Sequence, residues 1–302
     1  MSIKNTNIDI VYTWVNSSDK KWQKKYKIHA KEIDEKRFTS HNELKYSLRS
    51  IYKYAKWINN IFIVTDDQIP HWLNTKHPKI KIIDHKQIFE NKKHLPTFNS
   101  QAIECHINNI PNLSERFFYF NDDTFLGNYL KKSDIIDKKL KISYMKNVDN
   151  NCNLINEDFF RNIFTPELHH YSWHNSQKLL NSKFPNRNVN CNWHQGILLK
   201  KSLFKDIKIK YKKYFDNTSS SKFRSKTDIT PIRFIYEYVN CLGITNQKKF
   251  TSFHLFNGSI SNLNLLLNQK PTFFCVNCVS NDNEKEFESI MNEKFPKCPF
   301  EL

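Results

Sequence analysis

The chain has 302 residues, of which 39% are hydrophobic and 14% aromatic, enough for one large α/β domain or a domain with an appendage. Only four glycines are present, so there is no Gly-rich dinucleotide fingerprint or P-loop, which argues against a Rossmann dehydrogenase and a nucleoside-triphosphate kinase. A net charge of +17 favours anionic partners: nucleotide sugars, phosphate-linked polymers, anionic membrane surfaces or nucleic acid.

We expect no membrane-spanning segment and no signal peptide. No apolar run approaches the length needed to cross a bilayer, and the first residues, MSIKNTNIDIVY, lack a signal peptide's apolar region. These features predict a cytoplasmic protein, at most peripheral to the inner face of the cell membrane. Seven cysteines without tight pairing favour reduced thiols over a disulfide framework. Cys275, Cys278 and Cys298 can hold zinc with one histidine, but a single C-x-x-C is weak evidence for such a site.

Four apolar runs with the composition of buried strands are each followed by acids or amides. The runs span residues 8–15, 60–65, 80–83 and 117–120, and the polar residues that follow them are Asn16, Asp66, Asp84 and the group Asn121, Asp122 and Asp123. Two stretches between the runs have helical periodicity. Residues 41–58 repeat apolar side chains at helical spacing after a cap at Ser40 or Asn42, and residues 98–111 do so after Asn99.

Strands that alternate with helices of this length indicate βαβ units and a mostly parallel sheet. The carboxyl edge of that sheet is then expected to carry Asp66, Asp84 and Asp123 together. Two adjacent carboxylates beside an amide, as in Asn121, Asp122 and Asp123, repel each other unless a divalent cation or an arginine lies between them. The alternative for this segment is an Asx-rich turn without a metal.

The same segments resemble the Stealth family. The strings IDIVYTWVNSSD and ELKYSLRSIYKYAKWINNIFIVTDDQIPHWLN, followed by LPTFNSQAIECHINNIPNLSERFFYFNDDTFLG, are similar to its first and second conserved regions. FTPELHHYSWHNSQKLL resembles the third region, SSSKFRSKTDITPIRFIYEYV its arginine-bearing segment, and residues 270–302 its fourth region. The family includes bacterial capsule hexose-1-phosphate transferases and the catalytic subunit of the animal N-acetylglucosamine-1-phosphotransferase.

The resemblance implies an α/β fold with a mostly parallel, Rossmann-like sheet of the glycosyltransferase-A type that binds a nucleotide sugar, flanked by helices and followed by a helical second half. It implies a single catalytic domain over residues 1–302, with a soft division between 1–146 and 147–302. The implied reaction moves a sugar 1-phosphate from a nucleotide-diphosphate sugar to a hydroxyl of a glycan acceptor and releases a nucleoside monophosphate. The alternatives are a metal-dependent glycosyltransferase that moves the sugar alone, and a degenerate, non-catalytic anion-binding protein.

The resemblance also implies roles for particular residues. Asp123, with Asp122, is expected to hold Mg²⁺ or Mn²⁺ on the diphosphate, and Arg224 to clamp a phosphate with its planar fork. His170 is the candidate base for the acceptor hydroxyl, with His169 and His174 as open alternatives. In the fourth region the family's acid after Asn277 is replaced by Cys278, a thiol that cannot replace a carboxylate on Mg²⁺, so Asp282 becomes the candidate third ligand.

The remaining candidates come from both lines of reasoning. Asp9 is costly to bury within an apolar run unless it is paired, so we expect it to bind a partner such as Arg49 or to lie in the site. Tyr12 or Trp14 can stack on the base of the nucleotide, although core packing is the usual role of such residues. The other candidate substrate-binding residues are Asn16, Arg49, Asp66, Asn99, Asn121, Asp228 and Asn277.

Two lysine-rich stretches are interleaved with aromatic residues, Lys20–Lys27 and Lys200–Lys213. Such runs are usually solvated helix faces, and peripheral contact with an anionic membrane is the next interpretation. A nucleic-acid partner is not expected.

Overall fold

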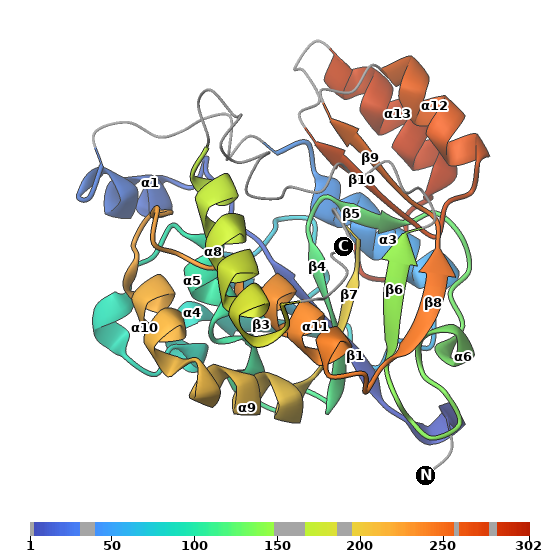
Figure 1. Ribbon diagram of the computed structural model, residues 1–302. Coiled ribbons are helices and arrows are strands. Elements are labelled where there is room, and N and C mark those ends of the chain that lie inside the picture. Colours follow the sequence, from blue (N-terminus) through green and yellow to red (C-terminus); the bar gives the residue numbers. More distant parts are fainter. Residues whose placement is uncertain (1–2, 31–39, 148–166, 186–194, 257–259, 278–282) are drawn as a thin grey trace.

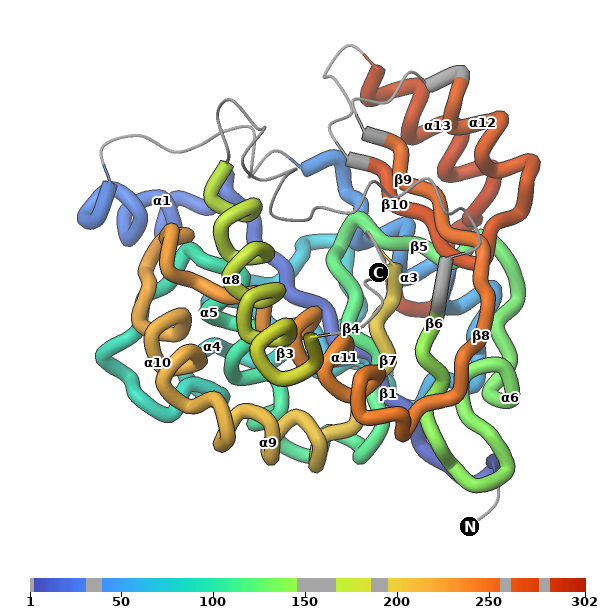
Figure 2. Tube along the Cα trace, viewed as in Figure 1, coloured from blue at the N-terminus to red at the C-terminus, as the bar shows by residue number. Residues whose placement is uncertain are grey.

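The computed structural model describes residues 3–30, 40–147, 167–185, 195–256, 260–277 and 283–302 (Figures 1 and 2). Its central element is a five-stranded sheet in the order β3-β2-β1-β4-β7. The strands are β1 (Ile8–Thr13), β2 (Ile61–Thr65), β3 (Ile80–Asp84), β4 (Arg116–Asn121) and β7 (Ile197–Lys200). The first four are parallel to one another, and β7 is antiparallel to β4. The predicted α/β fold with a mainly parallel sheet is therefore confirmed.

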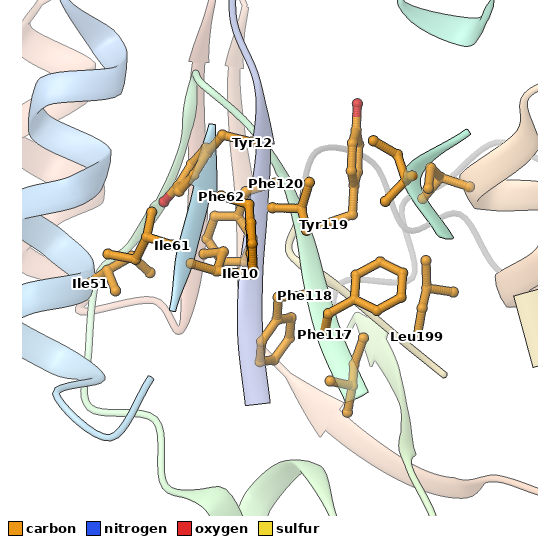
Figure 3. Close-up of a cluster of buried hydrophobic side chains, with 14 of the residues drawn as sticks. Ile10, Tyr12, Ile51, Ile61, Phe62, Phe117, Phe118, Tyr119, Phe120 and Leu199 are labelled. Carbon is orange, nitrogen blue, oxygen red and sulfur yellow. The ribbon is translucent and has the colours of Figure 1, made fainter. Parts of the chain in front are cut away.

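The four predicted runs form four of these strands because both of their faces are covered. Figure 3 shows Tyr12, Phe118 and Phe120 on the side of the sheet that faces α3 (Glu43–Tyr54), while Phe117 and Tyr119 point to the other side. This alternation follows from the two-residue repeat of a strand. A parallel sheet buried on both faces accounts for runs that are almost continuously apolar.

Helices lie on both faces of this sheet (Figure 1). Besides α3, the helices of the described residues are α1 (Lys20–Lys27), α4 (His85–Ile88), α5 (Ser100–Glu104), α6 (Lys132–Ile135), α8 (Leu168–Lys183), α9 (Lys201–Lys210), α10 (Lys212–Ser220), α11 (Pro231–Cys241), α12 (Ile260–Asn268) and α13 (Glu284–Lys294). Short 3-10 turns lie at Ile3–Asn5, Lys92–His94 and Ile107–Asn109. No helix among the described residues is long and apolar enough to cross a membrane.

The two predicted helices differ from expectation at their ends. α3 begins after Asn42, but the Asn42 side chain makes no capping hydrogen bond. The Glu43 carboxylate instead accepts hydrogen bonds from the Ser40 hydroxyl and the His41 backbone N–H. The second helix is capped by Asn99 as predicted, since its side chain accepts from the Gln101 N–H, but α5 has only five residues before the chain turns into a 3-10 segment.

The described residues of the second half form four strands in addition to the predicted helices. β7 completes the central sheet. β10 (Phe273–Asn277) lies between β5 (Thr124–Leu126) and β9 (Ser252–Phe256) in a three-stranded sheet, and β8 (Asn246–Phe250) pairs with β6 (Ser143–Asn147). Each of the three sheets that the described residues form therefore joins residues from both sides of position 147, and that position does not separate two independent sheets.

Candidate active site

The candidate site lies at the carboxyl edge of the central sheet. β1, β2, β3 and β4 are parallel and end at this edge. From β1 the chain continues to β2 and β3 on one side and then returns to β4 on the other, so the strand order reverses between β1 and β4. Ligands of open α/β sheets bind at such a reversal. Thr13 and Asn121 end β1 and β4 and are partners in register there.

Asp122 and Asp123 form the turn between β4 and β5, here named the acid turn. Burial raises the pKa of Asp122 well above its ordinary value, and the charges of Asp123 and Glu43 raise it further. Burial also raises the pKa of Asp123 to about 7, with a further contribution from Glu43. No lysine, arginine or histidine of the described residues forms an ion pair with either carboxylate. The described part of the chain thus places two carboxyl groups here without a neutralising cation, and each group favours its protonated form.

β10 forms one wall of the acid turn. Cys275 is the register partner of Thr124, and the Val276 N–H donates to the Asp123 carbonyl at 3.3 Å. Burial raises the pKa of the Cys275 thiol well above its ordinary value, so the neutral thiol hydrogen-bonds the Asp123 carboxyl. Asn277 ends β10. The strand β10, which belongs to the segment that resembles the fourth region, therefore lies beside the second region. Cys278 and Asp282 lie outside the described residues.

A second polar group connects β1, β4 and α5. The Tyr119 hydroxyl lies 3.0 Å from Thr13 Oγ1 and donates to the Glu104 carboxylate at 3.3 Å. Burial raises the pKa of Glu104 to about 7, although the Ile232 N–H, the Arg224 charge and Tyr119 act in the opposite direction. Burial and the charge of Glu104 are the main causes that raise the pKa of Tyr119, and the charge of Asp122 contributes as well. The second polar group and the acid turn are therefore electrostatically linked.

Arg224 lies against this second group from a loop between α10 and α11. Its Nη2 donates to Ser100 Oγ at 3.5 Å, and its charge lowers the pKa values of Glu104 and Asp228. The buried Asp228 carboxylate holds the loop in place by accepting from the Ser225 N–H at 2.8 Å and the Asn99 side-chain amide at 2.9 Å. Asn99 and Asp228 are therefore positioning residues in the described structure, and they join the α5 amino terminus to the loop of Arg224.

The structure distinguishes the candidate histidines on α8. Burial is the main cause that lowers the pKa of His169 to about 4, and the nearby charge of Arg224 adds to it. His170 lies next to His169, with ring centroids 3.9 Å apart, but its Nδ1 accepts a hydrogen bond from the Glu167 N–H. That bond leaves Nε2 as the protonated nitrogen of a neutral His170 ring. Of these two neighbours, His169 is the one whose pKa is lowered by the charge of Arg224, and His170 is partly used in capping α8.

Asp9 neither lies at the site nor binds Arg49, which corrects the expectation that it does one or the other. It is fully buried at the opposite end of β1 from the carboxyl edge. Its carboxylate accepts hydrogen bonds from the Asn59 amide and the Asn60 N–H at 2.9 Å and from the Ser114 N–H at 2.7 Å. These donors satisfy the charge that the sequence left unexplained, so Asp9 fixes the loops that enter β2 and β4.

Arg49 is also a structural residue in the described part of the chain, and its ion-pair partner there is Glu301 rather than Asp9. Its Nε and Nη2 donate to the two carboxylate oxygens of Glu301, both at 2.7 Å. Its Nη1 donates to Asn292 Oδ1 and to the Phe295 carbonyl. The Cys298 backbone N–H donates to the Glu301 carboxylate, so Cys298 lies beside the Arg49–Glu301 ion pair. Cys275 lies beside the acid turn instead. The described residues therefore do not bring these two cysteines together for zinc.

The two aromatic candidates of β1 have different positions. Tyr12 is 0% exposed and its hydroxyl lies 2.8 Å from Ser47 Oγ on α3, so it has no surface on which a base can stack (Figure 3). This corrects its assignment to substrate binding. Trp14 follows β1 at the carboxyl edge and is only half-buried against the core, so it remains a candidate.

The acids of the carboxyl edge are not gathered into one cluster as expected. Asp66 forms an ion pair with Lys25 at 2.9 Å, and Asp84 caps α4 by accepting from the Lys86 N–H. β1 lies between β2 and β4, so the strand of Asp66 is about 10 Å from the strand that leads to Asp123. Asn16 is exposed and its side chain accepts from the Ser18 N–H in a local turn. Asp66 and Asp84 thus lie at the same sheet edge as Asp123, but each is engaged with a partner of its own.

Sequence reasoning did not assign Glu104 and Tyr119 to the site. Both positions carry a local signal. Glu104 lies one helical turn after Ser100 on the short helix that Asn99 caps, and Tyr119 precedes Asn121 by two residues on β4, so it shares a face with the end of the strand. Their meeting, however, depends on how α5 packs against β4.

The acid turn has the donor chemistry of a divalent-cation site but not a complete ligand set. Carboxylate oxygens are the donors that Mg²⁺ and Mn²⁺ prefer, and a cation here would offset the burial and repulsion that raise both pKa values. No group of three His, Cys, Asp or Glu side chains in the described residues is arranged to hold a metal ion. Asp122 and Asp123 thus fit as two ligands, and Asp282 lies outside the described part of the chain.

Comparison with known proteins identifies the family. Models of the Stealth protein conserved regions match this chain at residues 6–28 for region 1, 37–144 for region 2 and 194–238 for region 3. The chain belongs to the Stealth family. Region 3 includes Arg224 and Asp228, whereas the string at 164–180 that resembled this region lies outside the match.

Several relatives that are named for their activity are similar to most of the chain. A capsular polysaccharide phosphotransferase of Haemophilus influenzae is 36% identical over 97% of this chain and 86% of its own length. Another from Actinobacillus pleuropneumoniae is 37% identical over 79% of this chain and 66% of its own length. A third, from Neisseria meningitidis, is 33% identical over 89% of this chain and 77% of its own length.

Two solved glycosyltransferase-type enzymes show distant likeness. The glycosyltransferase GlyE of Streptococcus pneumoniae is 11% identical, with a TM-score of 0.42, and the match covers 97% of this chain and 61% of that one. The glucosyl-3-phosphoglycerate synthase of Mycobacterium tuberculosis, solved with Mn²⁺ and UDP, is 7% identical, with a TM-score of 0.38 over 88% of this chain and 76% of that one. Likeness at this level carries no functional conclusion.

Proposed function

We propose that this chain is a capsular or exopolysaccharide phosphotransferase that transfers a sugar 1-phosphate from a nucleotide-diphosphate sugar to a hydroxyl of a glycan acceptor. The observation that carries the proposal is the relatedness, at 33 to 37% identity over most of the chain, to proteins named capsular polysaccharide phosphotransferases. The arrangement of the acid turn, Glu104 and Arg224 around one sheet edge supports it.

The reaction forms one bond to phosphorus and breaks another. The acceptor oxygen attacks the phosphorus that carries the sugar, the bond from that phosphorus to the bridging oxygen breaks, and a nucleoside monophosphate leaves with the bonding electrons. Catalysis of such transfers depends on alignment and on neutralising phosphate charge. Arg224, held by Asp228 and Asn99, supplies a planar guanidinium for the phosphate oxygens.

The proton of the acceptor hydroxyl needs a base near neutral pH. Glu104, with its pKa raised to about 7, and His169 both lie by Arg224 and are the two candidates. Because the pKa of His169 is lowered to about 4, its ring is neutral near pH 7 and able to accept a proton. The negative charge of a bound phosphate would raise this pKa. The His170 ring lies beside His169, and we propose that it positions the His169 ring.

Asp122 and Asp123 are the residues that would hold Mg²⁺ or Mn²⁺, with Asp282 as the proposed third ligand. A bound cation supplies positive charge for the diphosphate oxygens. Titration of Mn²⁺ followed by electron paramagnetic resonance tests this without any turnover. Binding by the wild type, lost in Asp123→Asn and weakened in Asp282→Asn, supports the assignment, and equal binding by all three proteins refutes it.

The function is tested by incubating the protein with a panel of nucleotide sugars, a divalent cation and capsular oligosaccharide acceptors. Released nucleotides are separated by anion-exchange chromatography. Release of a nucleoside monophosphate, with a new phosphodiester signal in phosphorus NMR, supports the proposal. Release of the nucleoside diphosphate indicates transfer of the sugar alone, and release of neither from any donor refutes the enzymatic function.

A further inference from the structure

α1 separates lysines and aromatic residues onto opposite faces. Lys20, Lys21, Lys24 and Lys27 are exposed and lie within one arc of the helix, and we name them the α1 basic face. Trp22 and Tyr26 are buried on the other side. Lys25 lies between the two faces and is engaged with Asp66 at the end of β2.

The aromatic side of α1 attaches the helix to the candidate active site. The Tyr26 ring lies 4.8 Å from the Phe98 ring and 5.1 Å from the Phe223 ring, centroid to centroid, and Trp22 lies 5.4 Å from Phe98. Phe98 and Phe223 are stacked at 5.3 Å, and the Phe98 N–H donates to the Lys222 carbonyl. Phe98 directly precedes the cap of α5, and Phe223 directly precedes Arg224. α1 is therefore fixed one residue from the proposed phosphate-binding arginine.

The α1 basic face is not explained by the stability of the helix. Lys20 and Lys21 occupy the first turn, where the helix dipole disfavours positive charge, and Lys20 and Lys24 are a like-charge pair at i,i+4 spacing. α1 contains no acidic residue, and Asp19 at the cap is engaged with the Trp22 N–H. Burial of Trp22 and Tyr26 has to offset this repulsion. Because these lysines destabilise the helix and lie beside the site, we infer that the α1 basic face has an anionic partner.

We propose that the α1 basic face binds the glycan acceptor as an anionic, phosphodiester-linked chain and leads its end to Arg224. This inference rests on the proposed function, because each transfer of a sugar 1-phosphate to a hydroxyl creates a phosphodiester with one negative charge. Repeated transfer makes a polyanion whose older units extend away from the reacting end. Lys20 to Lys27 span about 10 Å along the helix axis, enough to meet more than one such charge.

The buried aromatic side also argues against two other polyanionic surfaces. A helix that lies in a membrane interface inserts its apolar face into the lipid, but that face of α1 already contacts Phe98 and Phe223. Single-stranded nucleic acid is held by stacking on exposed aromatic rings, and Trp22 and Tyr26 are only 2% and 4% exposed. What α1 offers to solvent is charge without an apolar or stacking surface.

The test compares two variants that each lose four positive charges. The first carries Lys20→Gln, Lys21→Gln, Lys24→Gln and Lys27→Gln. The control carries Lys138→Gln, Lys139→Gln, Lys248→Gln and Lys249→Gln, which are exposed near α6 and on β8, on the opposite side of the molecule from α1 (Figure 1). Binding of fluorescent inorganic polyphosphate, of neutral dextran and of phosphatidylglycerol vesicles is measured without donor, so the result does not depend on activity.

The α1 variant is expected to bind polyphosphate about tenfold or more weakly than the wild type, with dextran unaffected and the control changed far less. By analogy with single-stranded nucleic acid, loss of four contacts lowers the slope of log Kd against log salt by about 3. Once a donor and acceptor pair is known, KM of the α1 variant should rise more for acceptors of several phosphodiester units than for one unit.

An equal loss in both four-lysine variants overturns the proposal, since it would show only an effect of net charge. Loss of vesicle binding with unchanged polyphosphate binding overturns it in favour of a membrane surface. If no nucleotide sugar is turned over, the proposed function fails, whereas the polyphosphate measurement still decides whether the α1 basic face binds a phosphate-linked polyanion. Circular dichroism checks that the α1 variant is folded, which is expected because glutamine keeps helix propensity and removes repulsion.

Discussion

Replacement of Asp123 by asparagine is expected to stabilise the metal-free protein at alkaline pH. Burial and the charge of Glu43 raise the pKa of Asp123 to about 7, so the folded state disfavours the charged carboxylate. Below about pH 4 the group is protonated in both folded and unfolded chains and has no effect. As the pH rises from about 4 to about 7, the unfolded chain ionises while the folded chain still holds the proton, so stability is lost over this range and the full loss is present above pH 7. The neutral amide of the Asp123→Asn variant carries no charge at any of these pH values, so the variant avoids this loss.

The size of the effect follows from the same pKa. A pKa difference of about 3 between folded and unfolded chains corresponds to about 4 kcal/mol, since one pH unit is 1.36 kcal/mol. Asp123 is only half-buried and shares its titration with Asp122, so solvent screening reduces the expected gain to about 1–2 kcal/mol at pH 8. At pH 4 the wild type and Asp123→Asn should be equally stable within about 0.5 kcal/mol.

Urea denaturation in EDTA at the two pH values measures this difference. The exposed Asp206→Asn on α9 is the matched control and should change stability at neither pH. Added Mn²⁺ should then stabilise the wild type by about 1.4 kcal/mol at ten times its Kd but not Asp123→Asn, which should also be inactive. A variant that is destabilised at pH 8, or a gain of the same size at both pH values, contradicts the account of the acid turn.

Three further substitutions separate catalytic from structural roles. Arg224→Lys keeps the charge but loses the planar fork, and kcat/KM should fall about a hundredfold; a near wild-type rate would show that Arg224 does not grip the phosphate. Glu104→Gln should lower kcat and remove a limb near pH 7 from the pH profile if Glu104 is the base, whereas an unchanged profile with a lower rate assigns that role to His169. Arg49→Ala should cost about 3–5 kcal/mol of stability in urea denaturation by leaving Glu301 buried and unpaired, and a loss below about 1 kcal/mol would contradict the buried ion pair.

The carboxyl edge was predictable because its signals are local. The apolar run Phe117–Phe120 is followed closely by Asp122 and Asp123, so one short segment predicts a buried strand that ends in acids. The structure contains that strand and that turn. Asn99 as a cap was predictable for the same reason. Arg224 and Asp228 were found only through resemblance to a family, since nothing in their own segment indicates that Asp228 reaches Asn99, 129 positions away.

The errors arose where the partner is remote in the sequence. Asp9 meets its donors 50, 51 and 105 positions later, and Arg49 meets Glu301 at a separation of 252. A buried charge predicts that some partner exists but not which one, and a phosphate is as good a candidate as a carboxylate until the chain is folded. Tyr12 was ambiguous for a similar reason, because its exposure depends on where α3 lies.

The pairing of β10 with β5 has a consequence for the order of events during synthesis. At about 5–20 residues per second, the ribosome delivers Cys275 roughly 8–30 s after Thr124, its register partner. Through that interval β4 and the acid turn can join the central sheet while β5 lacks its neighbour and presents unpaired backbone groups. A nascent chain can thus contain the sheet and both aspartates well before it contains the wall that encloses them, so the activity should appear abruptly and late, and fragments released before β10 should be prone to aggregation rather than partly active.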